Sequence, residues 1–398
     1  MTFLRVIGTL FEHIFSIIIN MNRIIKKPVL LDGKFADAKK FRPIPPPVGK
    51  WPYNLDIEEV EPKVSGKENE LVFHMVGDTG SAKDLSFQRL LALQLIKQAK
   101  GDKNKAQFLY HLGDIVYDHG EREEYPAQFF KPFEEYPGPI FSIPGNHDAE
   151  VNLLNESPYE SLDGYMDVFC DSRQRYVKFS EGSSRKSMIQ PNVYWTLNTP
   201  VATIIGLYGN VAKFGVITED QKKWFVEELK KHALDSEGKV LIVCLHQSPF
   251  SADINHGSSL AMIEFLESAY IEAGVKPDIV FSGHVHNYQR FIRNYPDGAR
   301  VPYIVAGAGG YAMLHPLARE GNRMISTDHA LLKDVKLEKY CFEQYGFLKI
   351  RIVRTEANLS LIGEYYTIPL DAKYDKDFDA TLYDRFEILL KQSEMTLC

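Results

Sequence analysis

Residues 71–80 have the sequence Leu-Val-Phe-His-Met-Val-Gly-Asp-Thr-Gly, an apolar run that ends in a glycine and an aspartate. The run at 71–76 is typical of a buried strand, and Gly77 lets the backbone turn so that Asp78 projects from the strand tip. Further strands are predicted at 108–112, 140–143, 240–245, 279–281 and 303–306. They alternate with helical spacing over 85–99, 218–232 and 260–273, and Thr218 with Gln221 forms a capping-box pattern. This alternation predicts an α/β layered domain.

Four further segments share the arrangement of a strand followed at once by polar side chains. The five motifs are Gly77-Asp78-Thr79-Gly80, Gly113-Asp114-Ile115-Val116-Tyr117, Gly145-Asn146-His147-Asp148, Val243-Cys244-Leu245-His246 and Gly283-His284-Val285-His286. Each falls just past the carboxyl end of a predicted strand, where α/β folds bind ligands. Together they supply carboxylate, phenol, amide and imidazole groups, which suit iron, manganese or zinc ions. The sequence therefore predicts that five distant loops meet at a metal site.

The five motifs, in this order on this strand pattern, resemble the calcineurin-like metallophosphoesterase superfamily, and more closely its purple acid phosphatase branch. The resemblance covers about residues 71–310. Gly80 stands where most of the superfamily has a histidine ligand, and Tyr117, three residues after Asp114, replaces that histidine. The fold that the resemblance implies is of the α/β class, a four-layer α/β/β/α sandwich of two mixed sheets flanked by helices.

The resemblance also implies a centre of two metal ions, Fe(III) and a divalent ion that would be Fe, Zn or Mn. By that resemblance the ferric site is formed by Asp78, Asp114, Tyr117 and His286, and the divalent site by Asp114, Asn146, His246 and His284. Asp114 would bridge the two ions. In purple acid phosphatases the tyrosine phenolate binds Fe(III), and its charge transfer gives the colour.

The implied function is that of a binuclear metal-dependent phosphoric ester hydrolase, most closely a phosphomonoesterase that uses metal-bound hydroxide. His147 follows the ligand Asn146 and is the candidate general acid for the leaving oxygen. His256, ten residues after His246, matches one of the two substrate-facing histidines that plant members of the family often carry side by side. Its neighbour is Asn255, so the sequence departs from the plant pattern there.

Two other functions remain open at this stage. The same metal centre would serve a phosphodiesterase that acts on cyclic nucleotides or phospholipid head groups, and the ligands do not separate the two reactions. The alternative of another class is a metallophosphoesterase fold recruited as a non-catalytic binding scaffold. Such proteins usually lose ligands, whereas all seven are present here, so the sequence favours an enzyme.

Several polar residues near the motifs have structural interpretations. His74 and His111 lie inside predicted strands and are expected to be core or supporting hydrogen-bond partners. Asp148 is expected to orient His147 or to cap a turn. The glycines of 307–310 are assigned to backbone routing. Residues 149–190 are polar and irregular, and our hypothesis is that this excursion overhangs the site and carries substrate selectivity.

The chain divides by composition into four parts. Residues 1–38 are an N-terminal extension whose segment 3–20 has the pattern of an amphipathic helix, able to pack on the protein itself, on a partner or on a membrane surface. Residues 39–70 are a proline-rich connector, and 71–366 form the catalytic domain. Residues 367–398 are a C-terminal extension, with strands expected before it at 347–354 and 359–366 and a terminal helix at 386–390.

Composition excludes some classes of partner. The 398 residues carry a net charge of -7, so no cationic field favours a nucleic-acid substrate. No apolar run is long enough for a membrane span, and the N-terminus lacks the charge order and cleavage site of a signal peptide. Cys170, Cys244, Cys341 and Cys398 lack the paired spacing of a zinc or redox site. We expect a cytoplasmic protein whose partner is a phosphate ester, with a peripheral membrane location or secretion as the alternatives.

Overall fold

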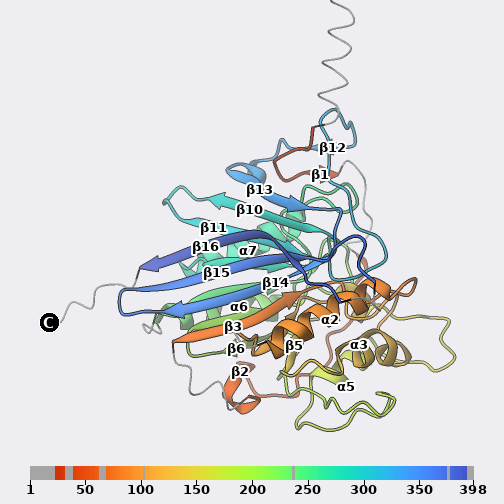
Figure 1. The fold of residues 1–398 in the computed structure, drawn as a ribbon. Helices are drawn as coiled ribbons and strands as arrows, with labels where there is room; N and C mark the ends of the chain where they lie inside the picture. Colours follow the sequence, from red (N-terminus) through yellow and green to blue (C-terminus); the bar gives the residue numbers. More distant parts are fainter. Residues whose placement is uncertain are drawn as a thin grey trace, which may run out of the picture.

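Two large mixed β-sheets form the centre of the molecule in the computed structural model, which describes residues 23–31, 39–61, 69–101, 104–234, 238–373 and 377–391 (Figure 1). The eight-stranded sheet has the order β13 (Val335–Cys341), β10 (Tyr288–Asn294), β11 (Arg300–Ala306), β9 (Ile279–Ser282), β8 (Val240–Leu245), β7 (Ala202–Gly206), β6 (Trp195–Asn198) and β2 (Asn54–Asp56). The six-stranded sheet has the order β16 (Thr381–Lys391), β15 (Asn358–Thr367), β14 (Gly346–Arg354), β3 (Glu70–Val76), β4 (Phe108–His111) and β5 (Ile140–Ser142). A small sheet pairs β1 (Leu30–Leu31) with β12 (Ile325–Ser326).

Each large sheet contains a parallel block that includes the strands before the motifs. In one block β3, β4 and β5 are parallel, with Met75 opposite Tyr110 and Tyr110 opposite Phe141. In the other, β7, β8, β9 and β11 are parallel, with Cys244 opposite Phe281. Because neighbouring parallel strands end on the same side, the motifs of each sheet emerge together at one edge.

The long helices cover the outer faces of the sheets. Helix α2 (Ser86–Lys100) packs on β14, whereas α6 (Glu219–Leu234) and α7 (Leu260–Ala273) pack side by side, with α6 on β7 (Figure 1). Shorter helical segments are η2 (Ile57–Glu59), η4 (Arg122–Glu124), η5 (Pro126–Phe130), α3 (Lys131–Phe133), α4 (Asn146–Ala149), α5 (Asp163–Phe169) and η6 (Ala330–Leu332). The four-layer α/β/β/α prediction is therefore confirmed.

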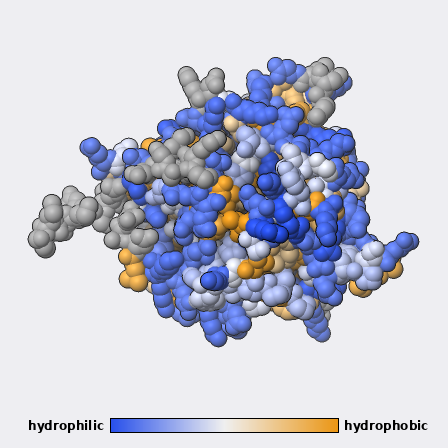
Figure 2. All heavy atoms as spheres, turned by 90° about the horizontal axis from the view of Figure 1, so that it is seen from below, coloured by the Kyte–Doolittle hydropathy of each residue, from blue (hydrophilic) through white to orange (hydrophobic). Residues whose placement is uncertain are grey.

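Aromatic side chains join the two sheets. The rings of Tyr110 on β4 and Trp195 on β6 are stacked with centroids 6.2 Å apart, and those of Tyr288 on β10 and Tyr365 on β15 lie 3.9 Å apart. All four residues are buried. Burial of such large apolar surfaces holds the sheets together and so fixes one motif edge against the other. The outer surface seen from below is mostly hydrophilic, with small apolar patches (Figure 2).

The predicted terminal helix at 386–390 is wrong, because these residues belong to strand β16, which pairs antiparallel with β15. Alternate side chains of the strand turn inward: Asp384 and Phe386 are buried, whereas Arg385 and Glu387 are exposed. A short apolar run does not by itself distinguish a strand from a helix, and here the two-residue alternation and the open edge of β15 determine the outcome.

The capping box predicted at Thr218 is only half formed. The backbone N–H of Gln221 donates to Thr218 Oγ1 over 3.3 Å, but the Gln221 side chain makes both of its hydrogen bonds to the backbone of Tyr208 instead. It thereby ties the start of α6 to the segment after β7. The Gln221 side chain therefore supports a neighbouring loop and does not complete the capping box.

The connector and the C-terminal extension both add strands to the large sheets, since β2 lies within 39–70 and β16 within 367–398. The four-part division of the chain stays a prediction. The amphipathic helix predicted at 3–20 lies outside the described residues. Within the described ranges no helix is long and apolar enough to cross a membrane, and Cys170, Cys244 and Cys341 are free thiols.

Candidate metal centre

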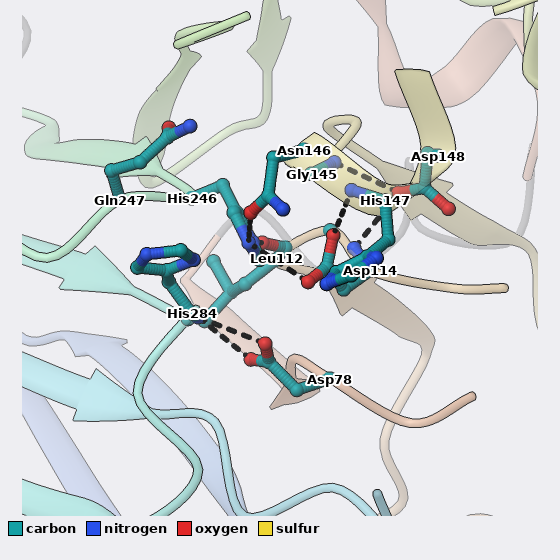
Figure 3. A network of polar contacts seen from close by, with 12 residues as sticks. Asp78, Leu112, Asp114, Gly145, Asn146, His147, Asp148, His246, Gln247 and His284 are labelled. Atoms are coloured by element: carbon teal, nitrogen blue, oxygen red, sulfur yellow. Dashed lines mark hydrogen bonds and ion pairs between the residues drawn. The ribbon is translucent and has the colours of Figure 1, made fainter. Parts of the chain in front are cut away.

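The structure brings all seven predicted ligands together at the edge where the two parallel blocks meet. Asp78, Asp114 and Asn146 follow β3, β4 and β5, while His246 follows β8 and the pair of histidines at 284 and 286 follows β9. Tyr117 lies on the loop after β4. All seven side chains are buried. Figure 3 shows Asp78, Asp114, Asn146, His246 and His284 arranged around one small space.

Close backbone approach at this edge requires glycine. Gly113 has a φ of 93°, and a Cβ there would lie 2.5 Å from the backbone nitrogen of Gly145 and 2.8 Å from His246 Nδ1. Asp78, Asp114 and His284 themselves adopt positive φ values of 59°, 54° and 67°. Non-glycine residues rarely enter this region, and such strain clusters at functional sites.

The Asp114 carboxylate lies at the centre of the cluster. Its Oδ2 accepts a hydrogen bond from the Tyr117 hydroxyl at 2.9 Å and lies 3.2 Å from His246 Nε2. Its Oδ1 accepts the backbone N–H of His147 at 2.9 Å (Figure 3). Oδ2 thus contacts a predicted ligand of each metal site, Tyr117 and His246, so this one oxygen lies where two ions could share it.

Asp78 lies on the side of the cluster next to the last motif. Its two oxygens accept the backbone N–H of His284 at 3.0 and 2.8 Å, and Oδ1 lies 3.3 Å from the Tyr117 hydroxyl and 3.6 Å from His286 Nε2. Tyr117 Oη is also 3.2 Å from His286 Nε2. Tyr117 Oη therefore contacts each of the other three groups predicted for the ferric site.

Backbone carbonyls fix the orientation of two imidazoles. Nδ1 of His246 lies 2.8 Å from the carbonyl oxygen of Leu112, and Nδ1 of His286 lies 3.2 Å from that of Met313. Because a carbonyl only accepts, each Nδ1 carries a proton, which leaves each Nε2 as the nitrogen that faces the carboxylates and that could bind a metal once it is deprotonated. This is the tautomer that a metal-binding histidine requires.

The donor set fits a pair of metal ions. Nε2 of His284 is buried and has no hydrogen-bond partner among the described residues, although an unpaired buried nitrogen is costly. Ligand atoms of Asp114, His246 and His284 all lie within 4.8 Å of one another. Asn146 Oδ1 adds a neutral oxygen 3.2 Å from His246 Nε2. A cation at this position would satisfy the orphaned nitrogen and the facing carboxylate.

The ionisation of the metal-free cluster reflects the crowding of these groups. Burial, and then the charge of Asp114, raise the pKa of Asp78 well above its usual value. Burial opposes ionisation of Asp114 as well, but the nearby His246 and His147 outweigh it and hold the pKa of Asp114 low. For His246, burial is outweighed by Asp114, which raises the pKa of the imidazole to about 9. Burial and Asp114 keep the pKa of Tyr117 well above 10, so the phenol is protonated without a cation.

The two predicted catalytic histidines lie at the rim of the cluster. Nδ1 of His147 lies 2.7 Å from the carbonyl oxygen of Asp118, and the ring lies 4.4 Å from that of Tyr117. The ring of His256 stacks on His284 with centroids 4.2 Å apart. Both histidines line a cavity of about 330 Å³ that opens over the cluster.

The residues assigned to supporting roles behave as supports. His74 is buried against Tyr136 and Gln98, and burial lowers its pKa to about 3; Nε2 of His111 contacts Thr79 Oγ1 at 2.9 Å. Asp148 does not contact the His147 ring. Its carboxylate instead accepts four backbone N–H groups, those of Asp114, Ile115, Val116 and Gly145. Asp148 therefore holds two motif turns together.

The cavity walls include residues that the motifs did not reveal. Lys40 comes from the connector, Val211 and Lys213 from the segment after β7, and Tyr311, Met313 and His315 from the loop after β11. Of the segment 149–190, which is described throughout, only Glu150 lines this cavity. The expectation that this excursion overhangs the site therefore fails for this cavity. No spacing signal in the sequence marks the wall residues, because their separation along the chain carries no periodicity.

Comparison with known proteins agrees with this geometry. A family model described as calcineurin-like phosphoesterase matches residues 71–288, which is more than half of the chain and spans all five motifs. The chain belongs to the calcineurin-like phosphoesterase family. The matched region starts at the strand before Asp78 and ends just after His286, so the family region and the metal centre coincide.

Relatives within the family include plant purple acid phosphatases. The chain is 30% identical over 174 residues to "Probable purple acid phosphatase 20" of Arabidopsis thaliana, covering 42% of this chain and 36% of the relative. It is 26% identical over 240 residues to "Purple acid phosphatase 1" of Ipomoea batatas, covering 58% of this chain and 45% of the relative. The matches thus span less than half the length of these curated relatives.

Solved structures resemble the chain more distantly. The structure titled "Structure of PhoD" has a TM-score of 0.45 and 11% identity, covering 81% of this chain and 70% of that chain. A putative 5'-nucleotidase from Staphylococcus aureus has a TM-score of 0.37 and 14% identity, covering 81% and 54%.

Proposed function

We propose that this member of the family is a purple acid phosphatase-like phosphomonoesterase with a binuclear metal centre. The observation that carries the proposal is the convergence of Asp78, Asp114, Tyr117 and the histidine lone pairs on one buried space that holds an orphaned His284 Nε2. Asp78, Tyr117 and His286 would hold the ferric ion and Asn146, His246 and His284 the divalent ion, with Asp114 shared by both. When bound, the metal pair would supply Lewis-acid activation of the phosphoryl group and of a water molecule.

The charge of the cavity supports a monoester. A phosphomonoester carries up to two negative charges, and the walls contain the cationic side chains of Lys40 and Lys213. Three histidines outside the ligand set, His147, His256 and His315, add imidazole groups to the walls. Among the described residues, the one acidic wall residue outside the ligand set is Glu150, which forms an ion pair with Lys40 at 3.3 Å. Cationic side chains around a small cavity favour a dianionic group over the monoanion of a diester.

His147 is positioned to protonate the leaving oxygen. Its Nδ1–H donates to the carbonyl of Asp118 and its backbone N–H donates to Asp114, so both the ring and the main chain are fixed. Nε2 is then the atom left for the cavity. An imidazolium proton at Nε2 can pass to the leaving alkoxide as the bond to phosphorus breaks.

The His147→Ala variant tests this role. We expect unchanged metal content and a kcat for an alkyl phosphate that falls by about 10²- to 10⁴-fold, the usual contribution of a general acid. An aryl phosphate with a good leaving group needs less protonation and should lose less. His119→Ala is the matched control, because His119 follows Asp118 on the neighbouring loop after β4 and does not line the cavity. Full turnover of the alkyl phosphate by His147→Ala would refute the assignment.

The reaction class is tested with paired substrates. Metal-loaded protein should hydrolyse p-nitrophenyl phosphate with a kcat/KM well above that for bis(p-nitrophenyl) phosphate, and a chiral thio-substituted phosphate ester should show inversion at phosphorus. A faster diester reaction would instead assign a phosphodiesterase. Protein that retains two metals but turns over neither ester would indicate a binding scaffold.

A further inference from the structure

The loop after β11 brings a third histidine into the cavity. His315 lines the wall together with His147 and His256, and only 5% of the residue is exposed. It belongs to none of the five motifs and follows His286 by a long, irregular interval. Its position in the cavity is produced by the tertiary fold alone.

Main-chain hydrogen bonds hold this loop against two other parts of the site. The backbone N–H of His315 donates to the carbonyl of His286 at 2.9 Å, and the side chain of Asn287 donates to the carbonyl of His315 at 2.8 Å. Further along, the backbone N–H of Ala318 donates to the carbonyl of Ala252 at 2.7 Å. The loop is therefore attached both to the last motif and to the segment that carries His256, and its position is preorganised.

The orientation of the His315 ring is fixed by a backbone donor. The N–H of His286 points to His315 Nδ1 at 3.2 Å, and the two rings stack with centroids 4.1 Å apart. A backbone N–H only donates, so Nδ1 holds the lone pair and the neutral ring carries its proton on Nε2. Within the described part of the chain, Nε2 makes no hydrogen bond. A fixed N–H donor is thus available on the cavity wall.

Positive charge lies on the same side of the cavity. The ammonium group of Lys213 donates to the carbonyl of Asn255 at 2.6 Å, beside His256. The edge of the His315 ring meets the His256 ring at 4.8 Å. Donors from three segments therefore converge where an anion above the metal cluster would lie.

A metal site at this wall is less consistent with the hydrogen bonds. Ligand atoms of Asp253, His256 and His315 lie within 4.8 Å of one another. However, the Asp253 carboxylate already accepts from Ser251 Oγ and from three backbone N–H groups, those of residues 255, 256 and 257. Its 3.6 Å separation from His315 Nδ1 exceeds a hydrogen bond, and that Nδ1 is occupied by His286. The hydrogen bonds of Asp253 therefore stabilise the loop that carries His256.

We propose that His315 is a phosphate-binding residue, whose Nε2–H donates to a phosphoryl oxygen of the ester substrate and of the phosphate product. The inference rests on the proposed phosphatase function and adds a residue that the family motifs do not contain. A neutral donor held in place by the backbone of a ligand loop binds an oxyanion without reorganisation. It also places one substrate contact on a loop that is hydrogen-bonded to the backbone of His286.

Two substitutions distinguish the donor function of His315 Nε2 from the acceptor function of His315 Nδ1. In His315→Asn, the amide oxygen can keep accepting from the His286 N–H, but nothing replaces Nε2. In His315→Gln, the amide nitrogen can reach the position of Nε2, but the acceptor at Nδ1 is lost. His329→Asn is the matched control, because His329 Nδ1 also accepts a backbone N–H, from Leu331 at 3.2 Å, away from the cavity.

The measurement is calorimetric titration of inorganic phosphate into metal-loaded protein, with metal content determined for each variant. We expect His315→Asn to keep two metals per chain and to weaken phosphate binding by about tenfold or more, the usual effect of losing a hydrogen bond to a charged group. His315→Gln should retain more of the affinity than His315→Asn, and His329→Asn should match the wild type. KM for the monoester should rise in parallel in His315→Asn.

Several outcomes would overturn the proposal. Unchanged phosphate affinity in His315→Asn with both metals present would show that His315 does not contact the anion. A third metal equivalent in the wild type that is lost in His315→Asn would show a metal site with Asp253 and His256. A wild-type protein that binds no metal and hydrolyses no ester would instead refute the proposed function, and is recognised before any variant is made.

Discussion

Three residues at the site adopt unfavourable backbone conformations that are maintained by hydrogen bonds to neighbouring residues. Asp78, Asp114 and His284 have left-handed φ values, which cost about 1–2 kcal/mol each in a non-glycine residue. The hydrogen bonds between Asp78 and the His284 N–H, and between Asp114 and the His147 N–H, hold these strained residues in place. These backbone conformations direct the carboxylates of Asp78 and Asp114, from two different loops, into the same metal centre. Turns without positive φ values would direct the side chains elsewhere.

Tyr117 is the residue that would select Fe(III) in the proposed metal centre. Its phenol donates to Asp114, and burial together with Asp114 raises its pKa, so it ionises only when a strongly polarising cation is bound. We expect iron-loaded wild-type protein to show a visible charge-transfer band and Tyr117→Phe to lose it. Absorption spectroscopy at equal iron content checks this.

The control for this prediction is Tyr311→Phe. The Tyr311 ring lies 4.5 Å from Tyr117 in the same cavity and is not a predicted ligand. This variant should keep the band. A band that persists in Tyr117→Phe would remove the tyrosine from the ferric site.

At the scale of elements, Asp148 joins the turns after β4 and β5. Oδ2 accepts from the backbone N–H groups of Asp114 and Gly145, and Oδ1 from those of Ile115 and Val116. An asparagine offers one acceptor oxygen and turns its amide donors toward two of these N–H groups. We expect Asp148→Asn to weaken metal binding by about 10- to 100-fold, as for other groups that orient ligands.

Equilibrium dialysis against a metal buffer measures this loss. Asp84→Asn is the control, since Asp84 also accepts a backbone N–H, from Ser86 at 2.9 Å, but at the surface. Its metal affinity should equal that of the wild type. Equal affinity in Asp148→Asn would mean that the two turns hold their positions without the carboxylate.

The last strand, β16, joins the two sheets through one buried carboxylate. Asp384 accepts hydrogen bonds from Tyr288 Oη and Arg290 Nε of β10, both at 2.8 Å. Removing it leaves both donors unpaired near the core. We expect Asp384→Ala to lower the free energy of unfolding by about 2–3 kcal/mol.

Denaturant titration measures this change. Arg385→Ala on the same strand is the control, because its ion pair with Glu387 is exposed, and it should change the free energy by less than about 0.5 kcal/mol. Similar values for the two variants would indicate that β16 adds little to the joining of the sheets.

At the scale of the whole molecule, the packing of the two sheets brings buried ionisable groups close together at the edge that carries the motifs. Without metal, Asp78 has a raised pKa because of burial and Asp114, and Asp114 raises the pKa of His246 to about 9 against the effect of burial. Both groups therefore hold a proton that a metal ion must displace. Binding releases protons, so the metal affinity should fall as the pH falls from 9 toward 6, by about tenfold per pH unit for each proton displaced.

Calorimetric titration of metal into chelator-treated protein, in buffers of different ionisation enthalpy, counts the protons released. Thermal unfolding with and without metal should show stabilisation that grows with metal concentration. Metal binding with no proton release between pH 6 and 9 would contradict the ionisation assigned to Asp78 and His246.

The amino-acid sequence was sufficient to predict the α/β class, the strands that carry the motifs and the set of residues that gather at their ends. Strand periodicity and glycine turns are local properties. The ends of five strands can therefore be predicted from short sequence segments, namely those of β3, β4, β5, β8 and β9. The family resemblance of the motifs then indicated the four-layer arrangement that the structure confirms. The ligand roles of these residues stay predictions.

Only the tertiary structure decided which other groups surround that centre. His315 reaches the cavity because its loop pairs with residues 286 and 252, and Asp148 binds four N–H groups instead of the His147 ring. The run at 386–390 became a strand because β15 offered an open edge. These outcomes depend on contacts between segments far apart in the chain. The free energy of such contacts cannot be predicted from a local pattern of residues.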